Sequence, residues 1–517
     1  MQDRETKTAH FGLMRWVAWS AGISAFALIS GLIWVSTLKV EVATRVFGQR
    51  VIVSGERAAL RLGVVDARTG RFMPGAKINV SLESEKGIFH ILKGKKGIQD
   101  TVGINFIVPK GLYGRSDYLV KSVLNGHEEL RRIGIRILKE TELGEGGEKY
   151  RDNDLHVTGD KAPRITRLGG DDRIELFAFP EGPALVSGME NELFFVIAGK
   201  GGEPLQATLK LDLVPGGFAA GPSGLITVKV KPRFGRWYKI HAQVTTEDQR
   251  TASFLVELQV PPVQVIVRPR ARVLKKGLDT SVSISSFRNK TFIYCDVWSQ
   301  GRWILTKAVK TLTGKAEIPL RFEHSSMMSS KALSGPLMIQ SYLNPFNPGR
   351  AHDERLIFVG NNVNGCNIAH KLTVAGYVLP AFEMAWNHLD GAVCRDTNMT
   401  RAALASALKG FHPPPLLLDS FNLKQEELKA FKSRVRWVLA GLLGGGGGIF
   451  LLVIYIIVLG NYRTGQKAMN DALTEESGPI SSSRPQGATI ELFALMTIIA
   501  LALAGLVYLL VSLRWRM

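Results

Sequence analysis

The feature that most constrains the fold of this chain is the alternation of apolar and polar residues in short blocks between residues 39 and 436. Residues 77–82 (KINVSL) and 208–213 (TLKLDL) are two such blocks. Alternation with a period of two buries one face of a β-sheet and leaves the other face in water. Gly, Pro and Asp residues separate the blocks, as they do in turns. The middle of the chain is therefore predicted to consist of antiparallel sheets.

This region is long enough for three β-sandwiches of about 100 residues each. We predict sandwiches at residues 39–145, 161–260 and 261–360. A Gly-rich acidic linker is expected at 146–160, and a mixed, partly helical region at 361–436.

Two segments of this region resemble a known module. Residues 66–76 have the form Asp-x-x-Thr-Gly-x-x-x-Pro-Gly-Ala between two strand blocks, and residues 180–191 with 204–207 continue a similar pattern. The pattern resembles the macroglobulin-like, Ig-like β-sandwich of bacterial alpha-macroglobulins and related envelope proteins, over about residues 40–260 and more weakly over 261–360. The resemblance implies a mainly β fold of tandem sandwiches in an extracytoplasmic protein.

The same resemblance argues against protease trapping. Alpha-macroglobulins carry a Cys-x-Glu-Gln thioester, and none of the three cysteines here, Cys295, Cys366 and Cys394, begins that motif. The chain is also much shorter than a complete trap.

Three runs without a charged residue, at 16–38, 437–462 and 492–513, concentrate the apolar residues. Each is long enough to cross a bilayer as a helix. We therefore predict three transmembrane helices, with a cytoplasmic tail at 1–15, a short loop at 463–491 and the lipid bilayer as a partner. The first run is too long for the apolar core of a signal peptide and lacks a convincing cleavage site, which favours an uncleaved anchor.

The second run contains five consecutive glycines, Gly444, Gly445, Gly446, Gly447 and Gly448. A glycine face lets another helix approach closely, so we predict that these residues pack against another span. Other membrane-protein subunits are predicted partners. A locally soft or kinked helix is the alternative.

Two sequence features indicate opposite orientations in the membrane. The Lys and Arg residues that flank the runs favour a cytoplasmic middle region. The module type favours the opposite side. We expect a multi-pass inner-membrane protein whose N-terminus is inside and whose large domain is periplasmic.

Cys366 and Cys394 lie 28 residues apart. In an oxidising compartment they could form a disulfide, which would constrain the unfolded chain by about 3–4 kcal/mol. Two buried free thiols are the alternative.

A helix is predicted to begin near Asn422 and to continue unbroken into the second uncharged run. Its basic residues Lys429, Lys432, Arg434 and Arg436 come late in the sequence before that run. They are candidates for contact with lipid headgroups, because anionic headgroups attract juxtamembrane basic residues. A solvated collar is the alternative.

The sequence lacks the common catalytic and cofactor-binding motifs. The sequence contains no phosphate-binding loop, His-Glu-x-x-His helix, Cys-x-x-Cys pair or Gly-x-Ser-x-Gly elbow. We therefore expect no metal or cofactor. The tripeptide Gly-Arg-Trp occurs twice and supplies Arg236, Trp237, Arg302 and Trp303 as candidate partner-binding residues. The alternative is that each tryptophan packs inside a sandwich.

The formal net charge of +20 favours an anionic ligand such as phospholipid or acidic glycan. Nucleic acid is not an expected partner, because no recognition fold for it accompanies the charge. We predict a membrane-anchored extracytoplasmic scaffold or interaction protein that is a subunit of an envelope complex. One alternative is an accessory subunit or enzyme of surface-polymer export or processing. Another is a protease-binding macroglobulin relative without the thioester. The absence of a catalytic motif favours a non-enzymatic role but does not exclude an enzyme.

Overall fold

The computed structural model divides the chain into two compact units. One comprises Met1–Ala43, Ala67–Thr69 and Ser420–Met517, and the other comprises Thr44–Asp66 and Gly70–Asp419. The structure describes residues 42–66, 71–96, 101–142, 163–233, 235–261, 265–275, 280–320, 334–344, 352–361, 364–375, 393–407 and 414–476, together with Thr69, Tyr377 and scattered residues between 19 and 40.

The first sandwich combines strands from both ends of the larger unit. Its strands are β1 (Val42–Phe47), β2 (Val51–Val53), β3 (Arg57–Asp66), β4 (Lys77–Ser84), β5 (Gly87–Lys96), β6 (Val102–Ile107), β7 (Gly114–Leu124), β8 (His127–Leu138) and β25 (Leu416–Asp419). They form sheets in the orders β25-β1-β3-β6 and β2-β8-β7-β4-β5. Asn125 and Gly126 both have positive φ and close the β7–β8 hairpin, as a two-residue turn of type I′ requires. A single-turn helix, η1 (Glu140–Glu142), follows β8.

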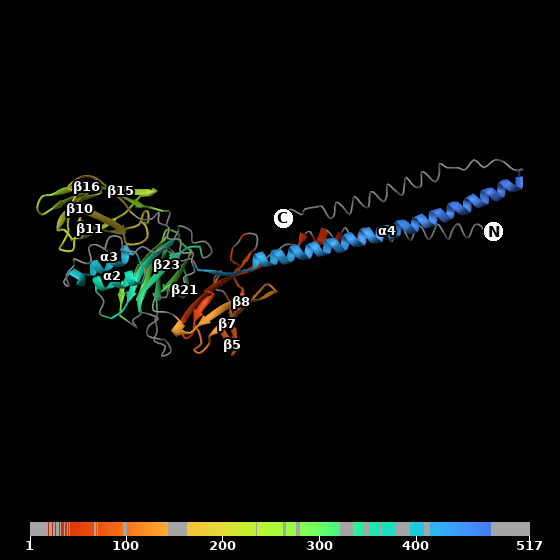
Figure 1. Cartoon of the computed structure of the whole chain (residues 1–517), viewed down its shortest axis with the longest axis horizontal. Coiled ribbons are helices and arrows are strands. Elements are labelled where there is room, and N and C mark those ends of the chain that lie inside the picture. The colour runs from red at the N-terminus through yellow and green to blue at the C-terminus, as the bar shows by residue number, and fades with distance from the viewer. Residues whose placement is uncertain are drawn as a thin grey trace. The chain divides into compact units, whose positions relative to one another are not determined.

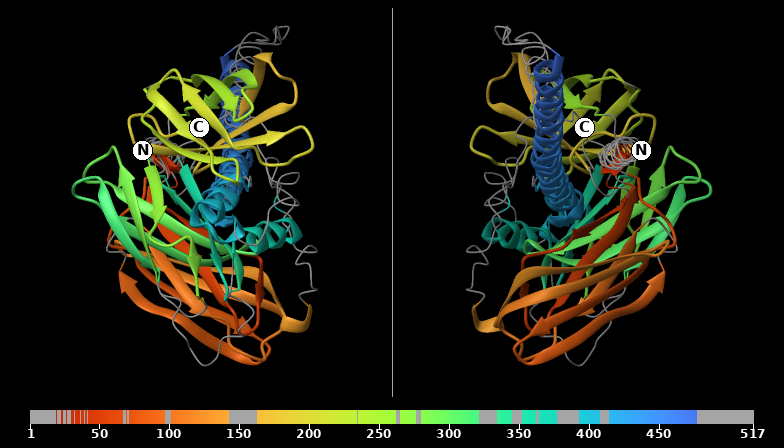
Figure 2. Two further views of the ribbon diagram at one scale, coloured as in Figure 1. Left: turned by 90° about the vertical axis from the view of Figure 1, so that its left-hand side faces the viewer. Right: turned by 90° about the vertical axis from the view of Figure 1, so that its right-hand side faces the viewer.

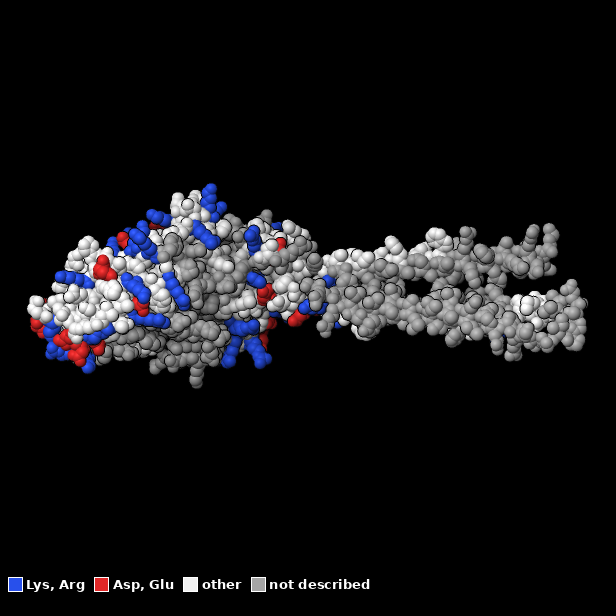
Figure 3. Space-filling view, turned by 90° about the horizontal axis from the view of Figure 1, so that it is seen from above, with Lys and Arg blue, Asp and Glu red and all other residues white. Residues whose placement is uncertain are grey.

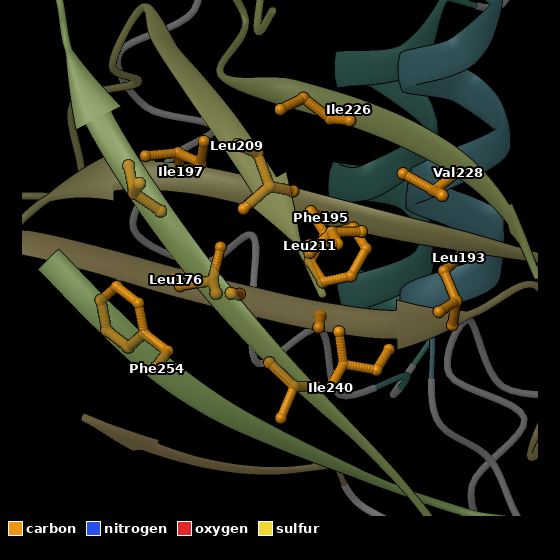
Figure 4. Packing of buried hydrophobic residues seen from close by; sticks show 14 of the residues in the cluster. Leu176, Leu193, Phe195, Ile197, Leu209, Leu211, Ile226, Val228, Ile240 and Phe254 are labelled. Carbon is orange, nitrogen blue, oxygen red and sulfur yellow. The ribbon is translucent and has the colours of Figure 1, made fainter. Parts of the chain in front are cut away.

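The second sandwich follows the expected alternation closely. Its strands are β9 (Arg164–Gly170), β10 (Ile174–Pro180), β11 (Asn191–Gly199), β12 (Ala207–Leu211), β13 (Val214–Ala219), β14 (Leu225–Val230), β15 (Trp237–Thr246) and β16 (Thr251–Gln259). The sheet orders are β10-β11-β14 and β13-β12-β15-β16-β9. Alternate residues of β10, β11, β12, β14, β15 and β16 point into one shared core, which includes Leu176, Phe195 and Ile240 (Figure 4).

The third sandwich has the same two-sheet plan. Its strands are β17 (Val265–Pro269), β18 (Val273–Leu274), β19 (Thr280–Ser286), β20 (Phe292–Ser299), β21 (Arg302–Lys310), β22 (Lys315–Leu320), β23 (Gly335–Tyr342) and β24 (His352–Val359). The sheet orders are β17-β19-β22 and β18-β24-β23-β20-β21. Val282, Cys295 and Ile339 belong to its core.

Two short helices, α2 (Gly365–Val374) and α3 (Thr397–Ser406), follow the third sandwich. Each begins at a polar cap: Asn364 accepts a bond from the amide of Asn367, and Asp396 accepts one from the amide of Asn398. Both helices lie between the second and third sandwiches, beside β10, β11 and β23 (Figures 1 and 2).

The last described element is α4 (Ser420–Glu476), a single helix of 57 residues. It confirms the prediction of an unbroken helix that continues into residues 437–462. It begins directly after β25, two residues before the predicted cap at Asn422.

The prediction of a mainly β chain is correct, but the prediction of three transmembrane helices is wrong. Within the described residues, no helix is both long enough and apolar enough to cross a membrane. The prediction used the length, the lack of charge and the apolar content of the three runs, and the helices that the structure describes do not bear it out. The run at 492–513, the tail at 1–15 and the linker at 146–160 lie outside the described residues, as does most of 16–38.

Candidate functional site

Arg61, on β3, is the centre of the junction between the first and third sandwiches. Its guanidinium donates to the Asp296 carboxylate on β20 and to the Tyr342 hydroxyl on β23, both at 2.5 Å, and to the Thr306 hydroxyl on β21 at 2.6 Å. The Tyr342 hydroxyl in turn donates to the second oxygen of Asp296. The side chains of Arg61 and Asp296 are 1% and 0% exposed. The junction therefore contains a buried, hydrogen-bonded ion pair.

Three aromatic rings surround the same guanidinium. Its central carbon lies 5.0 Å from the ring centroid of Tyr294, 5.3 Å from that of Trp303 and 5.4 Å from that of Tyr342. Tyr294 and Tyr342 stack on each other with centroids 6.0 Å apart. A desolvated cation over an aromatic face is attracted by about 2 kcal/mol. The rings of the third sandwich thus hold a cation that belongs to the first.

The ionisation of this cluster follows from its burial. Burial lowers the pKa of Arg61, but the Asp296 carboxylate and the Tyr342 hydroxyl raise it by more, so that the guanidinium stays charged. Burial raises the pKa of Tyr342 well above its ordinary value, and the phenol stays neutral. Burial also raises the pKa of Asp296, against the opposing effect of Arg61. Arg61 thus opposes the protonation that burial of Asp296 favours.

Two amide side chains of the first sandwich cover the free edge of β21. Asn105 on β6 accepts from the amide of Thr306 at 2.7 Å and donates to its carbonyl at 3.1 Å. Gln49 accepts from the amide of Trp303 at 3.0 Å and donates to the carbonyl of Gly301 at 3.1 Å. Side chains here replace the missing neighbouring strand, which protects the edge from pairing with another chain.

A second ionic cluster joins the second and third sandwiches. Glu181, which follows β10, lies 3.4 Å from Arg355 of β24 and 3.5 Å from Arg272, and these side chains are 4%, 1% and 14% exposed. Arg355 also pairs with Asp353, which accepts a bond from the amide of Val267 at 2.7 Å. Burial, together with the neighbouring charge of Arg355, lowers the pKa of Arg272 to about 10.

An apolar wedge completes this second junction. Ile368 and Leu372 of α2 and Met399 and Ala402 of α3 pack in one cluster with outward-facing residues of both sandwiches, such as Phe194. Arg401 of α3 forms an ion pair with Glu192 of β11. The helices therefore fill the space between two sheets that would otherwise each expose an apolar face.

Cys366 and Cys394, for which the sequence left a disulfide and two free thiols open, are joined by a disulfide, with Cα atoms 5.3 Å apart. The bond connects the first turn of α2 to the short helix η5 (Val393–Arg395) that precedes α3. It thus ties the two helices of the wedge together at one end.

The two Gly-Arg-Trp tripeptides lie in different environments. Trp303 is fully buried and stacks on Trp298 with centroids 5.9 Å apart, while Arg302 pairs with Glu56 of the first sandwich. The second tripeptide is therefore part of the junction between two sandwiches. It does not pack in a sandwich core.

The first tripeptide lies on the outside of the second sandwich. Arg236 is exposed and Trp237, at the start of β15, is half-buried. The guanidinium of Arg164, on β9, lies 4.8 Å from the Trp237 ring centroid. On the same outward face Lys239 and Glu257 form an ion pair at 2.9 Å. We call this surface, formed by the outward residues of β9, β15 and β16, the Trp237 face.

The remaining predicted residues lie on α4. Lys429 and Arg434 are exposed, and Lys432 and Arg436 are partly buried. The backbone of α4 is helical through Gly444–Gly448, but the surroundings of these glycines lie outside what the structure describes.

Sequence reasoning missed the residues that hold the sandwiches together. Arg61 was visible as the only charge in the apolar run 58–65, which is buried on both sides. Glu181 gave no comparable signal, because its partners lie far along the chain. Among the described residues, no three His, Cys, Asp or Glu side chains converge as ligands of a metal ion do.

Comparison with known proteins finds matches among solved structures only. No protein-family model matches the chain, and no curated protein does. Native alpha-2-macroglobulin of E. coli is 11% identical with a TM-score of 0.17, over 63% of this chain and 23% of that one. Dimeric latent PorU from Porphyromonas gingivalis is 13% identical with a TM-score of 0.22, over 62% of this chain and 34% of that one. A structure from a 1.5-MDa bacterial ice-binding adhesin is 8% identical with a TM-score of 0.16, over 63% of this chain and 99% of that one.

The chain thus spans about a quarter to a third of the macroglobulin and PorU structures that it matches. The likeness is one of fold, and at that level it agrees with the macroglobulin-like resemblance of the sequence.

Proposed function

We propose that this protein is an extracytoplasmic interaction scaffold, a subunit of an envelope complex that presents outward sheet faces to a partner protein. The observation that carries the proposal is the way the three sandwiches are joined. Buried ion pairs centred on Arg61 and Glu181, and the apolar wedge of α2 and α3, connect them within one compact unit. Sandwiches joined in this way keep their outer faces at fixed relative positions, which lowers the entropy lost when a partner binds several of them.

The disulfide supports the proposed location. Disulfides persist in oxidising compartments and are rare where thiols are kept reduced. The bond between Cys366 and Cys394 lies within the wedge, so an extracytoplasmic site of folding fits its structural position.

The Trp237 face is the surface that we assign to the partner. Aromatic and Arg side chains are enriched where proteins bind each other, and Trp237 with Arg164 provides both. His241 and Gln243 lie further along β15 on the same side and are exposed. Their neighbours across the sheet, Leu255 and Ser253 of β16, are only partly buried.

Site-specific photocrosslinking in cells that produce the full chain tests this assignment. A photoreactive residue at His241 or Gln243 should give one adduct of the same mass, and the same residue at Lys290, an exposed turn position of the third sandwich, should not. Trp237→Ala should abolish the adduct. An adduct that is absent, or that is insensitive to Trp237→Ala, would refute the assignment.

The proposed location has a separate test. Alkylation of free thiols in intact cells, followed by reduction and a second label, should show Cys366 and Cys394 protected from the first reagent. If the first reagent labels both residues before reduction, the extracytoplasmic location is wrong.

A further inference from the structure

One end of the first sandwich carries a cluster of cations. The cluster consists of exposed side chains from the β4–β5 turn, the β6–β7 loop and the adjoining ends of β7 and β8: Lys86, Lys110, Arg115, Arg136 and Lys139. We call it the basic end. None of these five side chains lies within ion-pair distance of a carboxylate in the described part of the chain. Elsewhere on the same sheet, Lys121 pairs with Glu128, and Arg132 pairs with Glu83.

The register of the sheet places two of these cations side by side. Arg115 of β7 lies directly opposite Arg136 of β8. Both side chains point away from the core, since their neighbours Ser116 and Ile135 are buried. Like charges directly opposite each other in an antiparallel pair are destabilising. Asp117 lies two residues from Arg115 on the same face but forms an ion pair with neither arginine, so an external anion would still stabilise this arrangement.

An exposed tyrosine gathers two more cations. The ammonium nitrogen of Lys139 lies 4.5 Å from the ring centroid of Tyr113, and that of Lys86 lies 5.1 Å from it. The ammonium of Lys86 is held there by a bond of 2.8 Å to the carbonyl of Gly111. Tyr113 is 55% exposed, so part of its side chain stays open to solvent beside two positive charges.

The cations are spread over several elements at this end of the sheet. Arg115 and Arg136 lie on adjacent strands, which are about 4.8 Å apart. Lys139 directly follows β8, and its ammonium shares the Tyr113 ring with that of Lys86. A single small anion would contact only some of these cations, but a linear polymer with a charge on each repeating unit could contact all of them.

We propose that the basic end binds a linear acidic polysaccharide whose sugars carry carboxylates. Arginine presents a planar fork of donors that matches a carboxylate. The separate cations match charges repeated along a polymer, and the exposed side chain of Tyr113 can contact a sugar. Figure 3 shows that Lys and Arg side chains also occur elsewhere on the molecule. An experiment must therefore distinguish binding at the basic end from attraction by the net charge of the whole protein. The inference rests on the proposed extracytoplasmic function.

The test compares two variants of the full chain with the same net charge. One replaces four cations of the basic end by Gln (Lys86, Arg115, Arg136 and Lys139). The control replaces four exposed cations of the second sandwich by Gln (Lys200, Lys210, Lys231 and Arg233). Binding of polygalacturonate is measured by titration calorimetry at two salt concentrations. Dextran, anionic phospholipid vesicles and duplex DNA are compared with it, and circular dichroism confirms the fold of each variant.

We expect the unchanged protein to bind polygalacturonate in a salt-dependent manner and not to bind dextran. The basic-end variant should bind at least about tenfold more weakly, because it loses four counterion-releasing contacts. The control variant should stay within about twofold of the unchanged protein, because distant surface charges are screened. Equal losses in both variants would mean that net charge alone attracts the polymer, and the proposal would be wrong.

Two further outcomes would also overturn the assignment. Vesicles or DNA bound as tightly, with the same dependence on the basic end, would indicate phosphate recognition. No binding of polygalacturonate by the unchanged protein would exclude carboxylate polymers of this kind. Neither outcome affects the photocrosslinking at the Trp237 face, so the failure of this inference can be distinguished from the failure of the proposed function.

Discussion

Replacing Arg61 by Met tests most directly whether the first and third sandwiches are held together by their buried ion pair. Met keeps most of the length of the side chain but leaves the carboxylate of Asp296 without its cation in a site that is 0% exposed. Removing one partner of a buried pair costs about 3–5 kcal/mol, because the remaining charge is uncompensated. We add no separate amount for the attraction between the guanidinium and its three rings. We expect Arg61→Met to lower the free energy of unfolding by about 4 kcal/mol.

Urea unfolding followed by tryptophan fluorescence measures this loss, since Trp303 and Trp298 lie beside the pair. With a slope of about 2 kcal/mol per molar urea, the transition that reports on these tryptophans should move down by about 2 M. The double variant Arg61→Met with Asp296→Leu should recover most of this loss. An apolar replacement of a whole buried ion pair is often neutral or stabilising.

The loss should also depend on pH. Burial raises the folded pKa of Asp296 above the unfolded value of 3.8 even with Arg61 present, and without Arg61 only hydrogen bonds from neighbouring side chains oppose that rise. When the folded pKa of Asp296 lies above its unfolded pKa, the protonated carboxyl stabilises the folded protein at low pH. This stabilisation is lost as the pH rises through the folded pKa. Arg61→Met should therefore be less destabilising near pH 4 than at pH 8. A loss below about 1 kcal/mol at pH 8, or a double variant no more stable than the single one, would contradict this account of the junction.

Three further predictions concern single residues. Tyr118 is fully buried in the first sandwich, and its hydroxyl has no hydrogen-bond partner among the described residues. Because an unpaired buried hydroxyl costs about 1–3 kcal/mol, Tyr118→Phe should leave the thermal midpoint of unfolding unchanged or raise it. A clear fall in the midpoint would disprove this reasoning. Burial raises the pKa of the Cys295 thiol to about 12, so iodoacetamide at pH 8 should label it only after denaturation, and rapid labelling of the native protein would count against this burial. The hydrogen bond from Arg173 lowers the pKa of Asp171 from 3.8 to about 2. The ionised carboxylate therefore stabilises the folded protein above the unfolded pKa, and this stabilisation is lost as the pH falls from 3.8 to about 2. Asp171→Asn should flatten the acid dependence of stability between pH 4 and pH 2, and an unchanged acid transition would refute this account.

The secondary structure of the sandwiches is largely readable from the sequence. Alternation in a segment such as 239–244 indicates which side chains face the core, because successive residues of a strand point to opposite sides of the sheet. The half-buried sheets of the second sandwich could thus be predicted without knowledge of their neighbours. The spacing of Cys366 and Cys394 allowed a disulfide but left two free thiols equally open, and the fold decided between them.

The apolar runs near the chain ends show where such reasoning goes wrong. An uncharged run of about 20 residues satisfies the length of a bilayer crossing. Length, lack of charge and apolar content are all local properties, and within the described residues no helix of the folded chain is both long enough and apolar enough to cross a membrane.

The sequence by itself determined the strands, their inward faces and the division into β modules, because these depend on the order of neighbouring residues. Only the tertiary structure decided which outward faces are covered. Arg61 and Asp296 are 235 residues apart, and nothing local to either one states that they will meet. The same holds for Trp303, which a hairpin alone would have left on the surface and which the first sandwich buries. Burial of an outward face depends on how whole sandwiches pack, and that packing is a property of distant surfaces and not of local sequence.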